Sequence, residues 1–290
     1  MDWDPIARHI ASVTGQPFVI RRRRALGGGC INAAAVVSDD CRRFFVKTNR
    51  ASGLDPFEAE ADGLAALAAP AVMRVPRPVC HGLCGDSAYL VLEFLDLGGL
   101  ADGARAGRAL AELHRQGTDR YGWHRDNYIG STPQENAPLA DWAAFWRERR
   151  LAPQLALASA QGHARALQTV GDRLLADLDA LLGHCPPPAL LHGDLWGGNL
   201  GYLPGGEPVL YDPAVYGGDR ETDLAMTELF GGFDADFYAA YREAWPLDAG
   251  YGVRRTLYNL YHVLNHLNLF GGGYLGQARA MIERLLAEVR

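Results

Sequence analysis

The sequence lacks the features of a membrane, secreted or nucleic-acid-binding protein. No uncharged apolar run reaches the ~20 residues that a bilayer-spanning helix needs, and the N-terminus has no apolar segment of signal-peptide type. The net charge is −6, with 28 basic against 34 acidic residues. Binding to a phosphate backbone requires a basic surface. These absences predict a soluble chain with neither a membrane nor a nucleic acid as partner.

Cysteine is also scarce. The five cysteines are odd in number and scattered, which fits a reducing compartment better than a disulfide framework and predicts a cytoplasmic location. Cys80 and Cys84 flank His81, but no second ligand pair follows at metal spacing, so a zinc site is not favoured. The oligomeric state is not encoded in any recognisable pattern, and we favour a monomer.

The periodicity of apolar residues changes near residue 96, from strand-like to helical. We therefore expect an α+β fold of two lobes, a small β-rich N-lobe (1–95) and a larger, mostly helical C-lobe (96–290). The N-lobe should contain helices at 5–14 and 57–67 and strands at 18–21, 33–37, 44–47, 79–80 and 89–94. The C-lobe should contain helices at 104–115, 141–159, 164–182, 222–230, 235–245, 253–270 and 277–289, with a strand-like interruption at 188–211.

That interruption carries the strongest chemical signal. A short apolar strand leads into His192-Gly-Asp194, Asn199 follows Asp194 by five residues, and Asp212 comes thirteen residues later after another apolar run. Phosphoryl transfer needs a carboxylate that accepts the proton of the attacking hydroxyl and oxygen ligands that hold Mg²⁺ against the nucleotide phosphates. The spacing matches the H-R-D-x-x-x-x-N and D-F-G elements of kinases. We interpret His192 as a buried residue that organises the loop.

A second segment, His124-Arg-Asp126-Asn127, looks even more like a kinase catalytic loop. The residue five positions after Asp126 is Ser131, however, and no strand-borne aspartate follows at the right distance. We interpret Asp126 and Asn127 as turn formers or loop contacts without a catalytic role.

The N-terminal half supplies a candidate nucleotide site. Gly27, Gly28 and Gly29 lie between two expected strands, where backbone N–H groups can approach phosphate. Lys47 lies on the third strand, where kinases place their phosphate-binding lysine. The next helix offers Glu58 and Glu60 as its ion-pair partner, and Glu60 is favoured because the core residues Leu64 and Leu67 fall on its face. The backbone around Glu93 and Leu95, at the lobe boundary, would bind the adenine edge.

Other side chains are candidates for the acceptor side. Trp196 lies two residues past Asp194 and could stack on a sugar. His262, Asn265 and His266 share one helix face, as a sugar-binding stripe or as a satisfied internal network. Three acidic residues that precede and open a helix, Asp219, Glu221 and Asp223, are read as structural. The basic run Arg21–Arg24 is read as the solvated face of an edge strand.

With these residues in place, the chain resembles the fructosamine kinase (ketosamine-3-kinase) family, relatives of the aminoglycoside phosphotransferases. The resemblance covers nearly the whole chain, and Asp194-Leu-Trp196 and Trp146-Arg-Glu-Arg-Arg150 narrow it to this family. Other matching segments are Gly27–Asn32, Phe45–Lys47, Phe57–Glu60, Val75–Pro78, Leu92–Leu95, Asp126–Gly130, Tyr211–Ala214, Asp223–Met226 and Leu229–Phe233.

The resemblance implies a protein-kinase-like fold and ATP-dependent phosphorylation of the 3-hydroxyl of a free or protein-bound ketoamine sugar, which would support protein deglycation. It further implies that Asp194 is the general base, that Asn199 and Asp212 bind Mg²⁺, and that Lys47 with Glu60 binds phosphate. The glycine run departs from the G-x-G-x-x-G pattern, which leaves open which N–H groups contact phosphate.

Two alternatives stay open at this point. One is a kinase of the same fold for another amino sugar or amino alcohol, of aminoglycoside or choline type. The other is a non-catalytic nucleotide-binding pseudokinase, against which the complete set of Lys47, Asp194, Asn199 and Asp212 counts. Cys30, within the nucleotide loop, raises the separate hypothesis of an oxidisable thiol that blocks ATP.

Overall fold

The computed structural model describes residues 2–27 and 32–289, and the chain forms two compact units. The first consists of Met1–Ala101 with Gly201–Pro213, and the second of Asp102–Leu200 with Ala214–Arg290. The sequence placed the boundary at 95/96 and residues 201–213 in the C-lobe. The difference arises because this segment bonds to the first unit: Leu210 N donates to Arg74 O, and Gly99 N to Tyr202 O, both at 2.9 Å.

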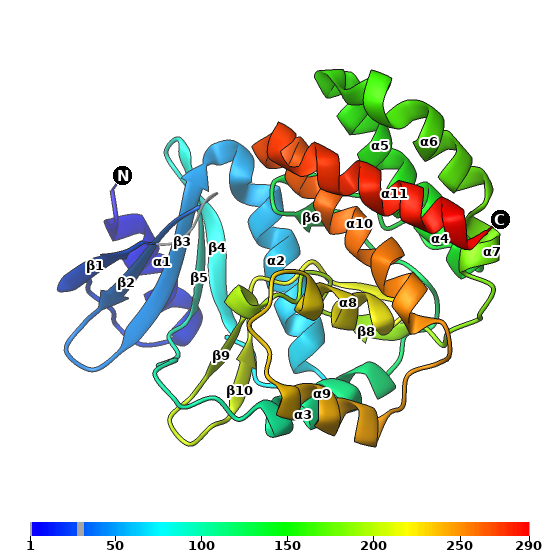
Figure 1. Ribbon diagram of the computed structural model, residues 1–290. Helices are drawn as coiled ribbons and strands as arrows, with labels where there is room; N and C mark the ends of the chain where they lie inside the picture. Colours follow the sequence, from blue (N-terminus) through cyan, green and yellow to red (C-terminus); the bar gives the residue numbers. More distant parts are fainter. Residues whose placement is uncertain (1, 28–31, 290) are drawn as a thin grey trace. The chain divides into compact units, whose positions relative to one another are not determined.

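The first unit is built on a five-stranded antiparallel sheet (Figure 1). Its order is β1-β2-β3-β5-β4, so paired strands are consecutive in sequence except for β3 and β5. A separate two-stranded sheet, β9 with β10, comes from the returning segment. The bounds are β1 Arg22–Leu26, β2 Ala33–Ser38, β3 Arg43–Arg50, β4 Pro78–Cys84, β5 Ser87–Glu93, β9 Leu200–Tyr202 and β10 Pro208–Leu210.

Two helices cover the sheet from opposite faces, because neighbouring strand residues point to opposite sides. Val46 of β3 packs in the core under α1 (Asp4–Thr14), while the next residue, Lys47, reaches Glu60 of α2 (Leu54–Ala68). Helix α1 begins with a proline in its first turn and ends at Gly15 in the left-handed conformation, which suits a C-terminal glycine.

One expected strand is wrong. The segment 18–21 is not a strand, and β1 begins at Arg22. Phe18 instead inserts into the core, where its ring meets Phe44 edge-on at 5.0 Å between centroids. Phe18 is thus a core residue that precedes the strand. An apolar pattern alone does not distinguish such a residue from one within a strand. The basic residues Arg22, Arg23 and Arg24 are exposed on this edge strand.

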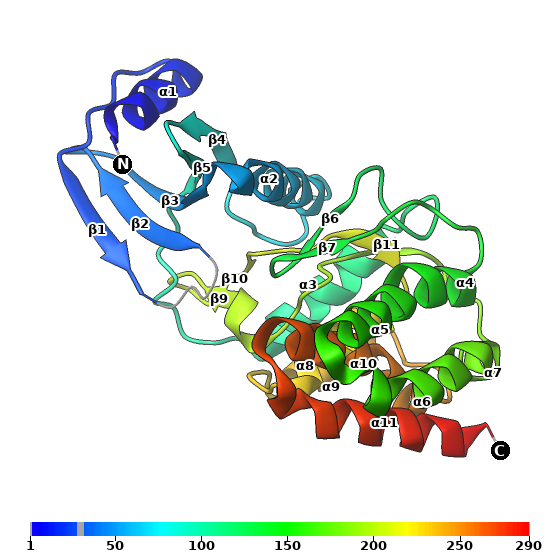
Figure 2. The same ribbon diagram turned by 90° about the horizontal axis from the view of Figure 1, so that it is seen from above.

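The second unit is mostly helical, with the twenty-residue helix α10 (Tyr251–Phe270) at its centre. This helix contacts α5, α8 and α11, as can be followed in Figure 2. Helices α3, α4 and α9 begin at aspartates whose side chains accept a backbone N–H three residues on. The helices are α3 Gly103–Arg115, α4 Trp142–Trp146, α5 Ala152–Ala158, α6 Ala164–Ala176, α7 Leu178–Leu181, α8 Glu221–Leu229, α9 Ala235–Ala244 and α11 Leu275–Glu288.

Short strands of the second unit bring together the segments that carry the candidate site. Strand β8 (Ala189–Leu191) pairs antiparallel with β11 (Tyr216–Gly218), and β6 (Asn127–Ile129) forms a hairpin with β7 (Thr132–Gln134). The helical pattern at 141–159 contains a π-helical turn, Arg147–Leu151, and another follows at Ser159–His163. In the described part of the chain, no helix is long and apolar enough to cross a membrane.

Candidate active site

A buried lysine joins two carboxylates in the first unit. The Nζ of Lys47 lies 2.7 Å from Glu60 Oε1 and 2.5 Å from Asp212 Oδ1. The expected pairing with Glu60 is therefore present. The other candidate, Glu58, instead has its Oε1 3.9 Å from Nδ1 of His81. Asp212 joins the cluster from the end of β10, on the segment that returns late in the chain.

The charges of this cluster decide its protonation. Burial lowers the pKa of Lys47, but the charges of Glu60 and Asp212 outweigh burial and raise that pKa above its ordinary value. Burial also raises the pKa of Glu60. The side chain of Asp212 is 47% exposed, against 12% for Glu60. Asp212 is thus the carboxylate that a ligand can reach.

The backbone of Asp212 is itself unusual. Its φ is +57°, in the left-handed region that residues with a Cβ seldom occupy. Strain of this kind persists only where surrounding structure holds it, and it clusters at functional sites. The turn aims Asp212 at Lys47 directly after strand β10.

In the second unit, strand β8 leads into the segment His192–Asn199, called here the Asp194 loop. Asp223 of α8 anchors its start: the carboxylate accepts His192 N at 2.7 Å and Gly193 N at 2.8 Å, and His114 Nε2 lies 3.2 Å away. Burial alone would raise the pKa of Asp223, but these partners hold it below its ordinary value. His192 is fully buried, and its Nδ1 accepts Asp194 N at 3.3 Å, in keeping with an organising role.

Glycine is required at the second position of this loop. Gly193 has φ +82°, and a Cβ added there would lie 2.0 Å from Ala214 O. Ala214 N also donates to His192 O at 2.8 Å. The Asp194 loop and the segment after Pro213 therefore touch backbone to backbone, which leaves no room for a side chain.

The five-residue spacing from Asp194 to Asn199 has a direct cause. A short 3-10 turn, Gly197–Asn199, folds the chain back so that Asn199 Nδ2 donates to Asp194 O at 2.8 Å and approaches Asp194 Oδ2 at 3.4 Å. Since the nitrogen is used in this way, Oδ1 is the atom of the amide with the chemistry to coordinate a metal. Trp196 is 41% exposed and lies against Gly198, where an added Cβ would be 2.3 Å from the indole.

The three candidates on α10 separate into different environments. His262 is buried, and burial lowers its pKa to about 3, so it is neutral. Asn265 bonds internally to Gln154 and to Ile129 O, both at 3.3 Å, as expected for an internal network. His266 is half-buried, and its ring contacts Phe230, Phe270 and Tyr274. Phe230 and Phe270 are 41% and 57% exposed, so His266 alone of the three lies beside exposed aromatic surface.

The look-alike segment at 124–127 has a structural role in the fold. Asp126 is exposed, and its Oδ1 accepts Asn136 N at 2.7 Å. Asn127 is buried, and its Nδ2 donates to Val215 O at 2.7 Å. Asn127 thus binds the backbone of the segment that follows Asp212 and Pro213, a role that its sequence neighbourhood did not indicate.

The other predicted nucleotide contacts are less fully described. Gly28, Gly29 and Cys30 lie outside the described residues, and Gly27 has open space around an added Cβ. Glu93 N donates to Arg77 O at 2.9 Å, so an adenine edge at Glu93 would have to use its carbonyl oxygen. The side chain of Glu93 pairs with Arg74 at 2.6 Å. Leu95 is half-buried just beyond it.

Sequence reasoning did not identify Asp223 as the anchor of the Asp194 loop, although it read the acidic group on α8 as structural. The neighbouring carboxylates agree with that reading. Glu221 forms two hydrogen bonds with Arg254, at 2.6 and 2.9 Å, and Asp219 accepts Tyr258 and His184. His184, Asp219 and Glu221 could in principle ligate a metal, but their carboxylates are already satisfied by these partners.

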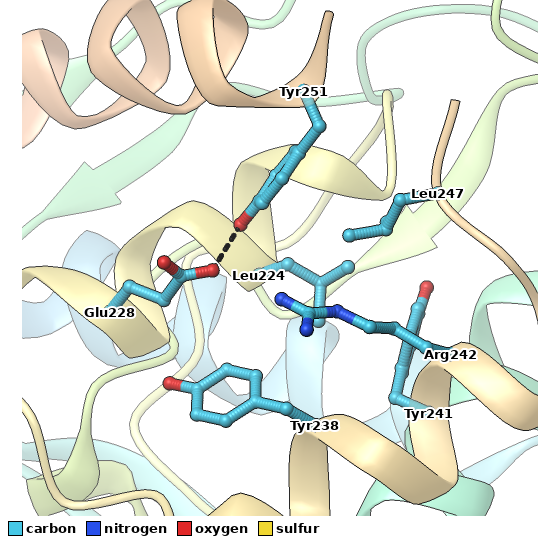
Figure 3. A pocket seen from close by; sticks show the side chains of 7 residues that line it. All are labelled: Leu224, Glu228, Tyr238, Tyr241, Arg242, Leu247 and Tyr251. Atoms are coloured by element: carbon cyan, nitrogen blue, oxygen red, sulfur yellow. Dashed lines mark hydrogen bonds between the residues drawn. The ribbon is translucent and has the colours of Figure 1, made fainter. Parts of the chain in front are cut away.

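A small pocket in the second unit, without room for a water molecule, is lined by none of the predicted site residues (Figure 3). A 2.7 Å hydrogen bond from Tyr251 to Glu228 crosses one side. The pocket is lined by Leu224, Glu228, Tyr238, Tyr241, Arg242, Leu247 and Tyr251.

Comparison with known proteins assigns the chain to a family. The family model described as fructosamine kinase matches residues 2–288. The chain belongs to the fructosamine kinase family. A Synechocystis sp. protein named probable ketoamine kinase is 48% identical, over 98% of this chain and 97% of its own. The chloroplastic protein-ribulosamine 3-kinase of Arabidopsis thaliana is 43% identical, over 99% and 89%.

Solved structures show the fold of the fructosamine kinase family in this chain. A fructosamine-3-kinase-like protein from Haemophilus somnus superposes with a TM-score of 0.91 at 31% identity, covering 98% of this chain and 97% of its own. An aminoglycoside phosphotransferase, in complex with AMP-PNP and hygromycin B, has a TM-score of 0.61 at 16% identity, over 97% of both chains. That level of identity shows the fold alone. The expected two-lobed, kinase-like α+β fold is confirmed.

Proposed function

We propose that this chain transfers the γ-phosphoryl group of ATP to the 3-hydroxyl of a ketoamine sugar. The observation that carries the proposal is the buried lysine bridge, Lys47 between Glu60 and Asp212, in a chain that the fructosamine kinase family model matches almost from end to end. The relatives are named for ketoamine and ribulosamine substrates. The low identity to aminoglycoside phosphotransferases gives no support for an aminoglycoside acceptor.

In this proposal, Asp194 accepts the proton of the attacking hydroxyl. Its loop is tied to Asp223 by two backbone N–H groups, so the carboxylate is positioned before the acceptor arrives. Lys47 binds the nucleotide phosphates, and Glu60 orients it. Trp196 forms one wall of the acceptor site, with His266 as a further contact and His262 and Asn265 behind it.

Mg²⁺ fits the oxygen donors that the chain offers. Asp212 is the exposed carboxylate of a cluster whose two carboxylates outnumber its one ammonium group, and Asn199 brings an amide oxygen. When bound, Mg²⁺ would neutralise charge that develops on the phosphate oxygens. Gly27, Gly28 and Gly29 would bind the phosphates, and the backbone at Glu93 and Leu95 the adenine.

Phosphorylation at the 3-hydroxyl would destabilise the ketoamine, since the product loses inorganic phosphate and the amine sheds its sugar. The expected partners are therefore free or protein-bound ketoamines. A cytoplasmic location and a monomeric state remain predictions of the sequence.

The test is ³¹P NMR of reactions that contain the protein, Mg²⁺-ATP and one acceptor at a time. Fructoselysine and ribuloselysine should each give a new phosphomonoester signal that decays to inorganic phosphate, whereas an aminoglycoside should give none. A phosphorylated aminoglycoside with unreacted ketoamines would overturn the acceptor assignment. Loss of ATP without any phosphorylated acceptor would overturn the transferase assignment.

A further inference from the structure

Three buried side-chain amides lie behind the Asp194 loop, and none of them belongs to the reacting groups. Asn127, Gln134 and Asn136, called here the amide cluster, come from the β6–β7 hairpin and the residues just after it. They are 6%, 2% and 0% exposed. Buried amides are costly unless they are hydrogen-bonded, so their bonding pattern shows what they hold.

The amide cluster forms hydrogen bonds with the backbone that follows Asp212 and Pro213. Asn127 Nδ2 donates to Val215 O at 2.7 Å, and Gln134 Nε2 donates to Ala214 O at 3.2 Å. Ala214 in turn donates its N–H to His192 O, and its carbonyl fills the space beside Gly193. The cluster therefore reaches the Asp194 loop through one backbone residue.

Within the cluster, Asn127 accepts both hydrogen bonds, and Gln134 and Asn136 donate them. Asn127 Oδ1 accepts from Gln134 Nε2 at 2.7 Å and from Asn136 Nδ2 at 2.9 Å. Asn136 Oδ1 accepts from Arg150 at 2.7 Å, and Gln134 Oε1 accepts Tyr261 OH at 2.7 Å. These partners fix which end of each amide is the nitrogen, so every donor that faces Ala214 and Val215 is specified.

Arg150 holds the outer end of the cluster. It is fully buried, it lies in the π-helical turn Arg147–Leu151, and it forms no ion pair within residues 2–27 and 32–289. Its guanidinium bonds to Glu135 O at 2.6 Å and lies 4.0 Å from the centre of the Tyr216 ring. A buried cation without a carboxylate partner is costly, and here its compensation comes from carbonyl oxygens, Asn136 and aromatic faces.

We propose that Asn127 and Gln134 are positioning residues for phosphoryl transfer. They fix the Ala214–Val215 backbone and, through Ala214, the conformation of the loop that carries Asp194. Because amides are neutral at every working pH, the support is rigid without adding charge beside groups that must bind a metal and accept a proton. The predicted effect on turnover rests on the proposed function, whereas the predicted effect on the conformation of the Asp194 loop does not.

The test is Asn127→Asp, which exchanges a donor for a carboxylate oxygen facing Val215 O. Burial should raise the pKa of the new carboxyl against the opposing charge of Arg150, which is separated from it by Asn136, and only the protonated form can donate to Val215. Turnover should fall by roughly 10-fold to 100-fold at pH 8, with the KM for ATP unchanged, and should recover in part towards pH 6. Wild-type turnover should not rise over that interval.

The matched control is Asn268→Asp. Asn268 is also buried on α10, and its Nδ2 donates to Gln154 Oε1 at 2.7 Å, so the chemical change is the same at a place that does not contact the Asp194 loop. It should lower stability without a pH-dependent loss of turnover. A similar pH profile in both variants would overturn the proposal, as would an Asn127→Asp variant with wild-type turnover at pH 8.

Hydrogen exchange separates this proposal from the proposed function. Peptides that cover 189–199 and 213–218 should exchange faster in Asn127→Asp than in wild type or Asn268→Asp at pH 8, whatever the acceptor is. Unchanged exchange would overturn the positioning role even if ketoamines are phosphorylated. Faster exchange in a protein that phosphorylates no ketoamine would overturn only the proposed function.

A second inference comes from composition. Lys47 is the only lysine of the 290-residue chain, and the other 27 of its 28 basic residues are arginines. Its side chain is 8% exposed, and its amine bridges two carboxylates, at 2.7 and 2.5 Å. A sugar aldehyde must reach an amine to add to it, with loss of water and a proton shift that gives the ketoamine. An amine that is buried and held between two carboxylates is out of reach for that addition.

We infer that the folded chain does not form lysine ketoamines and so offers no lysine-linked substrate to its own proposed reaction. The low reactivity of Lys47 towards sugars does not depend on the proposed function. The statement that the chain avoids its own reaction does rest on it. The inference predicts that a lysine placed on the surface would end this protection. Arg22, exposed on the edge strand β1, is the position for that change.

The test is incubation with ribose, followed by mass spectrometry of peptides. Wild type should show no sugar adduct on Lys47 when folded and should show one when unfolded in urea, while Arg22→Lys should form an adduct on the introduced side chain when folded. An adduct on Lys47 of the folded protein at a similar rate would overturn the inference. ATP and wild-type protein should then remove the adduct of Arg22→Lys; failure of that step alone would count against the proposed function.

Discussion

The chain contains two segments of similar pattern, His124-Arg-Asp126 and His192-Gly-Asp194, and their surroundings differ in every respect that matters for chemistry. His124 and Asp126 are exposed, whereas His192 is buried and Asp194 half-buried. Asp223 binds two backbone N–H groups of the second segment. The first segment ends at Asn127, which supports the backbone beside the second. A motif therefore identifies a site only together with what holds its backbone.

The largest effect is expected when the aspartate of the second segment is changed. Asp194→Asn should keep the fold and ATP binding but lower turnover by roughly 10²–10⁴, the range for loss of a general base. Turnover comes from a coupled assay for ADP, and ATP binding from calorimetry. Near-normal turnover in this variant would remove Asp194 from the reaction.

The next largest effect is expected for Asp223, which anchors the Asp194 loop. Asp223→Asn replaces a carboxylate that accepts two backbone N–H groups and lies beside His114, so we expect a loss of about 3 kcal/mol in the free energy of unfolding at pH 7. Urea denaturation measures it. A loss below about 1 kcal/mol would show that the loop does not depend on this anchor.

The same anchor predicts a pH dependence. The pKa of Asp223 is lowered in the folded chain, so the unfolded state takes up the proton first as the pH falls. Its contribution is thus present above the unfolded pKa of about 4 and is lost as the pH falls through the folded pKa. Wild type should lose stability more steeply than Asp223→Asn below about pH 4. Parallel curves would contradict the shift.

The middle residues of the two segments give a smaller contrast. Gly193→Ala places a Cβ against Ala214 O at a positive φ, so the loop must shift, with a cost of about 2 kcal/mol or more and lower turnover. Arg125→Ala, at the matching position, should change stability by less than about 0.5 kcal/mol. Thermal unfolding of both variants measures the difference. Equal effects would mean that the close approach of Gly193 to Ala214 carries no constraint.

The smallest effect is expected for Asp126→Asn. The amide oxygen of the variant can still accept Asn136 N, so turnover should stay within about twofold of wild type. A loss comparable with that of Asp194→Asn would show that the segment at 124–127 takes part in the reaction and would reverse the assignment of the two loops.

The sequence predicted those parts of the site that depend on short spacing. Lys47 and Glu60 lie on a strand and the following helix, and the helix face alone selected Glu60 over Glu58. Asp194 and Asn199 are joined by one tight turn. The fold class followed from the change of periodicity near residue 96, and the fructosamine kinase family from segments along the whole chain.

The supporting structure could not be predicted in the same way. Asn127 and Val215 are 88 residues apart, and His192 and Asp223 are 31 apart. Buried amides follow no apolar period, so Gln134 and Asn136 read as ordinary loop residues. Asn265 is a related case: its spacing on α10 left a binding stripe and an internal network equally open, and only the three-dimensional structure shows that Asn265 bonds inward.

The discontinuity of the first unit has a consequence for how the protein is made. Its last part, Gly201–Pro213, is separated from Ala101 by about a hundred residues of the second unit. At ribosomal rates of 5–20 residues per second, the N-terminal sheet must wait on the order of ten seconds for the strand that bonds to Arg74 and for Asp212, the partner of Lys47. A shortened gene that ends at Ala101 would thus lack Asp212 and keep only Glu60 of the two carboxylates in the bridge.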